Sequence, residues 1–166
     1  MAATFAWAQS HGAGPTVASL GISGNLFNFK RIDDATAANY STYPITAGDN
    51  SYEVWLRGKF TGTFNTVDNV QFWKSTDFSP ATGLSVMWAP ATPSAYTQGV
   101  TGASKAVSAV PTSDPGTANV RCRGGLASGL VASGYTDYIV LQLVTTSAAA
   151  AGDTSLAIFT MNYDES

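Results

Sequence analysis

The stretch SYEVWLRGKFTGTFNTVDNVQFWKS, residues 51–75, decides the fold, because two runs of alternating side chains flank a turn-rich segment. Successive side chains of a β-strand point to opposite faces, so this alternation predicts strands rather than helices. The apolar face of the two runs consists of Tyr52, Val54, Leu56, Phe60, Val70 and Phe72. The two runs therefore predict two strands that face one core.

The polar face of each run also carries its largest apolar side chain, Trp55 in the first run and Trp73 in the second. Around these tryptophans stand the polar residues Glu53, Arg57, Lys59, Asn69 and Gln71. Large exposed apolar patches are uncommon on soluble monomers, and Trp is enriched where proteins meet proteins. We therefore expect something to cover this face: the chain's own long loop, its N-terminal segment, a second subunit, or a sugar.

The rest of the chain repeats the strand pattern. Gly, Pro, Ser and Thr recur every few residues, and the two helix-like windows are too short to form a helix alone. The expected strands are 16–22, 26–32, 51–61, 69–75, 84–88, 118–123, 137–146 and 154–163. About eight short strands separated by turns predict an all-β fold, an antiparallel, jelly-roll-like β-sandwich.

The segment DYIVLQLVTT, residues 137–146, is apolar on both faces over most of its length. Such a strand is either central and covered on both sides, or it faces its own core on one side and another subunit on the other. The short loop SAAAAGD then leads to the last strand. We expect residues 137–146 and 154–163 to pair as a C-terminal hairpin.

The 166 residues fit one domain. Residues 1–15 are expected to form an N-terminal arm carrying Phe5 and Trp7, and residues 16–166 a single β-sandwich. Within the sandwich, residues 89–117 are rich in proline and small residues and predict a long loop excursion with Tyr96, with at most an irregular strand near 106–110.

Charged residues make up only 11% of the chain, against about 25% in typical proteins. The net charge is −3 with eight basic residues, so the sequence has no basic footprint for nucleic acid. No apolar run reaches membrane-spanning length, and the N-terminus lacks the regions of a signal peptide. We expect no nucleic-acid or membrane partner, and synthesis in the host cytoplasm.

Catalytic and metal-binding patterns are missing from the sequence. His11 is the single histidine, no nucleophile elbow, phosphate loop or zinc motif occurs, and the carboxylates stand in turn-like settings. Glu53 and Asp68 would form a glycosidase pair only if their hairpin brought them together, and Asp33 with Asp34 would need further ligands to hold calcium. We expect no enzyme, no cofactor and no metal site.

Cys122 is the single cysteine and lies between Arg121 and Arg123. The alternation of NVRCRGG favours a buried thiol that packs as a small apolar group. The flanking arginines leave a reactive thiol of lowered pKa as the alternative.

Residues 137–166 consist of an expected strand, a loop of small residues, a second strand and an acidic end with a tyrosine. Together with residues 51–75, they resemble small β-rich virion structural proteins of tailed bacteriophages. The resemblance is to the capsid decoration, or cement, class. It implies a jelly-roll-like sandwich that binds the outer surface of the head as a homotrimer and bridges subunits of the major capsid protein.

The candidate interface residues are the aromatic ones outside the expected core: Phe5, Trp7, Trp55, Trp73 and Tyr96. One alternative is a carbohydrate-binding or receptor-binding module, with Trp55 and Trp73 on adjacent strands as a stacking platform. A second alternative is a tail or head-fibre component of the virion.

Overall fold

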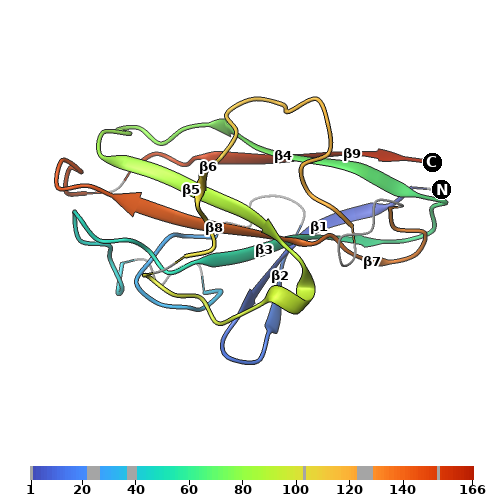
Figure 1. The fold of residues 1–166 in the computed structure, drawn as a ribbon, viewed down its shortest axis with the longest axis horizontal. Helices are drawn as coiled ribbons and strands as arrows, with labels where there is room; N and C mark the ends of the chain where they lie inside the picture. The colour runs from blue at the N-terminus through green and yellow to red at the C-terminus, as the bar shows by residue number, and fades with distance from the viewer. Residues whose placement is uncertain (1, 22–26, 37–40, 103, 123–128, 153) are drawn as a thin grey trace.

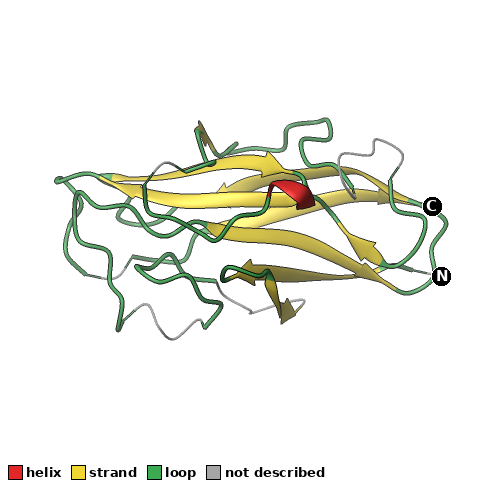
Figure 2. Cartoon of the chain, turned by 60° about the horizontal axis from the view of Figure 1, so that its bottom comes forward, coloured by secondary structure: helices red, strands yellow, loops and turns green. Residues whose placement is uncertain are grey.

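The computed structural model describes residues 2–21, 27–36, 41–102, 104–122, 129–152 and 154–166. Within them the regular structure is strand, apart from a 3₁₀ turn, η2 (Pro93–Ala95) (Figures 1 and 2). The strands are β1 (Thr4–His11), β2 (Thr16–Gly21), β3 (Val54–Thr61), β4 (Val67–Thr76), β5 (Leu84–Ala91), β6 (Ser108–Ala109), β7 (Gly134–Tyr135), β8 (Tyr138–Thr145) and β9 (Ile158–Glu165).

These strands form two antiparallel sheets, which confirms the predicted all-β sandwich. Among the described residues, a seven-stranded sheet has the order β2-β1-β3-β8-β5-β6, with β7 also paired to β3. The second sheet is the pair β4-β9, which runs along one side of the molecule in Figure 1. The chain changes sheet from β3 to β4, from β4 to β5 and from β8 to β9. As a result, the pair β5-β8 is nested in sequence within the pair β4-β9.

The main core lies between the two sheets. The predicted apolar face of residues 54–72 is buried there, with Phe60 and Phe72 fully inaccessible to solvent. The Phe72 ring contacts Trp88 of β5 at 5.8 Å and stacks on Phe159 of β9 at 5.9 Å between centroids. Phe72 therefore joins both sheets.

The predicted C-terminal hairpin is wrong. β8 pairs with β3 on one edge and β5 on the other, while β9 pairs with β4 in the second sheet. Both edges of β8 are occupied because its two apolar faces favour a central position, which was one of the two alternatives. Likewise, β3 and β4 lie in different sheets and are not neighbours.

The N-terminal segment is not an arm, because β1 is hydrogen-bonded between β2 and β3. Phe5 and Trp7 face the main core with ring centroids 5.1 Å apart, and Ala6 and Ala8 lie on the opposite face of the sheet, where Ala8 is buried. Residues 4–8 therefore do alternate. The positions facing away from the main core hold alanine instead of polar residues, so the period of two is hard to recognise in the sequence.

Two other expected strands differ in the described residues. Residues 27–32 and 118–122 have no strand assignment, and the second segment forms only an isolated bridge between Cys122 and Thr136. Positions 22, 26 and 123 of the expected strands lie outside the described residues. The long excursion contains η2 and the two-residue strand β6, which falls within the predicted window 106–110.

Candidate interaction surface

Trp55 lies on the face of the large sheet that points away from the main core, and it is 0% exposed. Its ring meets Tyr96 at 5.0 Å and Tyr138 at 5.2 Å between centroids, and Val140 and Ala106 complete a second buried cluster. Tyr96 and Ala106 belong to the long excursion. The cover over Trp55 is therefore the chain's own loop, which corrects the interpretation of Trp55 as an interface residue or sugar platform.

Glu53, the acidic neighbour of Trp55 on this face, fastens the loop to the sheet. Its buried carboxylate accepts hydrogen bonds from Trp55 Nε1 at 3.2 Å, Ser104 Oγ at 2.8 Å and the backbone N–H of Lys105 at 2.6 Å. A carboxylate buried with three donors is satisfied and holds its partners in place. At Glu53 and Trp55 the polar side of this segment is therefore buried beneath the loop.

Tyr96 fixes the start of the same loop. Its hydroxyl donates to the backbone carbonyl of Gly12 at 2.8 Å, in the turn between β1 and β2. Burial, with a smaller contribution from the charge of Asp33, raises the pKa of Tyr96 to about 12. The hydroxyl thus remains a donor across the physiological range, and Tyr96 acts within the molecule rather than at its surface.

The other three predicted interface residues, Phe5, Trp7 and Trp73, lie away from the Trp55 cluster. Phe5 and Trp7 are partly buried against the main core, where Phe5 also contacts Phe60 and Tyr163. Trp73 is half-buried on the outer face of β4, opposite Thr160 of β9. The structure brings Trp55 and Tyr96 together and keeps Trp73 on the other sheet, so the two tryptophans form no common platform.

The candidate acids are also apart. Asp68 is on β4 opposite Asp164, whereas Glu53 is enclosed by the loop on the large sheet, so they form no glycosidase pair. Asp33 accepts a hydrogen bond from the backbone N–H of Gly12, and Asp34 pairs with Lys30. Among the described residues no three His, Cys, Asp or Glu side chains gather as metal ligands, and no helix there has the length and apolar character to cross a membrane.

Cys122 is buried, as the alternation predicted. The residue is 3% exposed, and its Sγ lies 3.6 Å from the carbonyl oxygen of Val67. Burial first, and then the negative charge of Asp137, raise the pKa of Cys122 to about 11. The thiol is therefore protonated at neutral pH, and this contradicts the alternative of a reactive thiol with a lowered pKa.

We expect iodoacetamide to alkylate Cys122 of the folded protein about a hundredfold more slowly at pH 8 than in denaturant, because only the thiolate reacts. The rate should increase with pH towards about 11, since the thiol loses its proton there. Intact-mass spectrometry over time measures the modified fraction. Labelling of the folded protein at the rate of the denatured chain would contradict this assignment.

One end of the sandwich, called here the distal end, lies opposite the two termini (Figure 1). It is made by residues 41–50, 77–83, 146–152 and 154–158. It carries three large apolar residues with substantial exposure: Leu156 at 61%, Ile158 at 54% and Tyr43 at 39%. Both Leu156 and Ile158 belong to the expected strand 154–163. β9 begins only at Ile158, so Leu156 precedes the sheet and stands in solvent.

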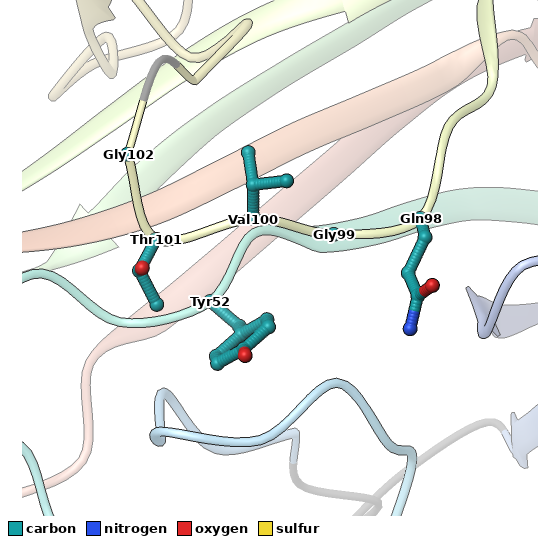
Figure 3. Close-up of a pocket in the computed structure, with 6 residues that line it drawn as sticks. All are labelled: Tyr52, Gln98, Gly99, Val100, Thr101 and Gly102. Carbon is teal, nitrogen blue, oxygen red and sulfur yellow. The ribbon is translucent and has the colours of Figure 1, made fainter.

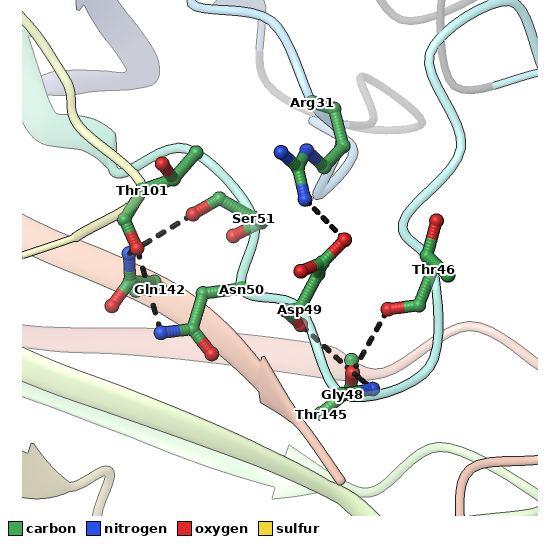
Figure 4. A network of polar contacts seen from close by, with 9 residues as sticks. All are labelled: Arg31, Thr46, Gly48, Asp49, Asn50, Ser51, Thr101, Gln142 and Thr145. Carbon is green, nitrogen blue, oxygen red and sulfur yellow. Dashed lines mark hydrogen bonds and ion pairs between the residues drawn. The ribbon is translucent and has the colours of Figure 1, made fainter. Parts of the chain in front are cut away.

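A polar network braces the distal end (Figure 4). The Thr145 hydroxyl accepts from the backbone N–H of Gly48 at 2.9 Å and donates to the carbonyl oxygen of Asp49 at 2.7 Å. The Asp49 carboxylate pairs with Arg31, and Gln142 donates to the carbonyl oxygen of Ser51 at 2.9 Å. The loop 41–50 is thereby held against the end of β8.

A shallow depression of about 370 Å³ lies between Tyr52 and residues 98–102 (Figure 3). Two of its six lining residues are glycines, and Val100 is 41% exposed there. Ligand sites for small molecules are normally enclosed and contain several converging polar side chains. This depression has neither feature, so the distal end is the stronger candidate for interaction.

Comparison of the chain with models of known protein families, with curated proteins and with solved structures gives no significant match.

Proposed function

We propose that this chain is a virion structural protein of a tailed bacteriophage, a capsid decoration protein that binds the outside of the head as a homotrimer. Its partner in this proposal is the major capsid protein, whose subunit contacts it stabilises. The distal end is the surface that docks. This proposal assigns the chain no catalytic step and no cofactor.

The exposure of Leu156 and Ile158 on a braced end is the observation that carries the proposal. Apolar side chains that stand in solvent gain free energy when a partner removes them from water, about 1.5–3 kcal/mol for each fully buried side chain. The hydrogen bonds of Thr145 hold the neighbouring loop in one conformation, so little entropy is lost on docking. A rigid apolar end suits a protein whose function is to bury contact area against a partner protein.

Two further features support this role. Both termini lie at the end opposite the proposed docking surface, where the backbone N–H of Ala3 donates to the Glu165 carboxylate at 2.8 Å (Figure 1). They leave the distal end unobstructed. The scarcity of charge fits a contact that salt weakens little, because few ion pairs are available for screening.

The carbohydrate alternative loses its basis, because Trp55 is enclosed by the loop and Trp73 is on the other sheet. No other feature described above favours sugar binding over protein binding. A role in the tail or a head fibre uses the same kind of docking surface, and differs in which part of the virion retains the protein.

Binding to emptied heads of the virus that encodes this chain tests the proposal. We expect the protein to co-sediment with heads and to be a trimer by light scattering. The double variant Leu156→Ser and Ile158→Ser should bind at least about tenfold more weakly, because two buried apolar contacts are lost. The matched control replaces two even more exposed valines away from this end, Val107→Ser and Val131→Ser, and should bind normally.

A monomer with no affinity for heads would overturn the proposal. Binding to purified tails rather than heads would favour the fibre or tail role. Saturable binding on a glycan array that survives the Leu156 and Ile158 changes would favour the carbohydrate module.

A further inference from the structure

Arg57 stands on the outer face of β3, beside Ala8 of β1. Its guanidinium carbon is 4.1 Å from the centroid of the Tyr135 ring and 4.7 Å from that of Tyr138. Two aromatic contacts at this range hold a guanidinium by cation–π attraction and restrict its rotamers. Arg57 is therefore a cation with a fixed orientation.

The Nε atom of Arg57 is buried and has no hydrogen-bond partner. The two terminal nitrogens of Arg57 form no hydrogen bond within the described chain, yet they are not buried without a partner as Nε is. They therefore reach solvent. The guanidinium thus presents its end, with two parallel N–H donors, to the outside. This geometry matches the two oxygens of a carboxylate.

Lys59 adds a second positive charge on the same face, two residues further along β3 and in register with Tyr135 of β7. Neither Arg57 nor Lys59 has a carboxylate within ion-pair distance among the described residues, whereas Lys30, Arg31 and Lys74 each have one. Glu53, which faces the same side, is already enclosed by donors from the loop. Two of the eight basic residues of a chain of net charge −3 thus lie side by side on this face.

We propose that Arg57, Lys59 and Tyr135 form a docking site for an aspartate or glutamate side chain of an acidic partner protein. This inference rests on the proposed function, because it names the partner chemistry of a chain that acts by binding protein. Charge complementarity selects the occupant: the site offers two cations and a fixed guanidinium fork. A nucleic acid is disfavoured because two cations are too few for the many phosphate contacts of such binding.

The surroundings also favour a protein side chain over a free small molecule. The residues lie on a sheet face rather than in the depression at Tyr52, and a flat face buries too little of a small ligand. Arginine and tyrosine, in contrast, are enriched among the residues that dominate protein interfaces. Arg57 is already immobilised, so binding costs little side-chain entropy.

The test is an NMR titration of the isotope-labelled full chain with a capped tetraglutamate peptide, without any virion. The Arg57 Nε–Hε signal should be visible, because this group is shielded from water. We expect saturable shifts of the Arg57 and Tyr135 signals with a Kd of about 1 mM, and no shift with capped tetralysine. The absence of shifts with tetraglutamate would overturn the inference and leave the head-binding result unaffected.

Charge-removing variants locate the effect. Arg57→Gln should weaken tetraglutamate binding about tenfold and Lys59→Gln about threefold, whereas Lys105→Gln removes an equal charge from the loop and should change nothing. Thermal unfolding checks that each variant is folded. An equal loss in all three variants would indicate nonspecific attraction and overturn the site, and tighter binding of a sulfated tetrasaccharide would overturn the carboxylate assignment.

Discussion

Replacing Trp55 with alanine is expected to lower the free energy of unfolding by about 3–5 kcal/mol. The Trp55 side chain is fully buried between the sheet and the long loop, and its ring contacts both Tyr96 and Tyr138. Its loss leaves a cavity, and it also removes the Nε1 donor to Glu53. Equilibrium denaturation in urea measures the change.

The same substitution should loosen the loop before it unfolds the sheet. The backbone N–H of Lys105 depends on the Glu53 carboxylate, which Trp55 helps to position, so its hydrogen exchange should accelerate more than that of β8. Trp73→Ala is the matched control, because Trp73 is only half-buried, and its cost should be clearly smaller. Equal costs for the two variants would contradict the assignment of Trp55 to a second core.

The side-chain faces of the strands could be predicted from sequence because they depend on local alternation. The period of two alone assigned Leu56 and Phe60 to one face and Trp55 to the other, and the three residues pack into two separate buried clusters accordingly. The same pattern indicated that residues 137–146 are apolar on both faces, and β8 is central and covered on both sides. These inferences needed no knowledge of which strands are neighbours.

Strand pairing could not be predicted, because it depends on contacts distant in the chain. β8 and β9 are separated by a short loop and still belong to different sheets, since β3 and β5 occupy both edges of β8. For the same reason Trp55 and Trp73 were expected on neighbouring strands. Pairing of β3 with β1 and of β4 with β9 separated them.

The candidate surfaces follow from these pairings. Because the loop encloses Trp55, this side chain and Tyr96 form part of the interior. Leu156 remains exposed because it precedes the first paired residue of β9, and Arg57 meets Tyr135 only because β7 folds back beside β3. Neither site has a sequence motif, since each one joins residues from segments far apart in the chain.

Replacing Phe72 with alanine should cost about 3–5 kcal/mol and weaken the contact between the two sheets. The Phe72 ring contacts Trp7 of β1, Trp88 of β5 and Phe159 of β9, so one side chain links three strands to its own. A two-stranded sheet such as β4-β9 is marginal alone and depends on this packing. Urea denaturation gives the free energy, and the fluorescence of Trp7 and Trp88 should change with the same midpoint.

The matched control is Phe78→Ala, which removes a ring of the same size from a half-buried position where it contacts Phe29. Its cost should be about 1–2 kcal/mol, because a partly exposed ring contributes less burial. If the two sheets form one cooperative unit, Phe72→Ala shifts a single transition for all probes. Loss of amide protection in β9 at a urea concentration where β3 and β8 stay protected would instead mean that the β4-β9 pair unfolds separately. In that case Phe72 would stabilise only its own layer, contrary to the packing described above.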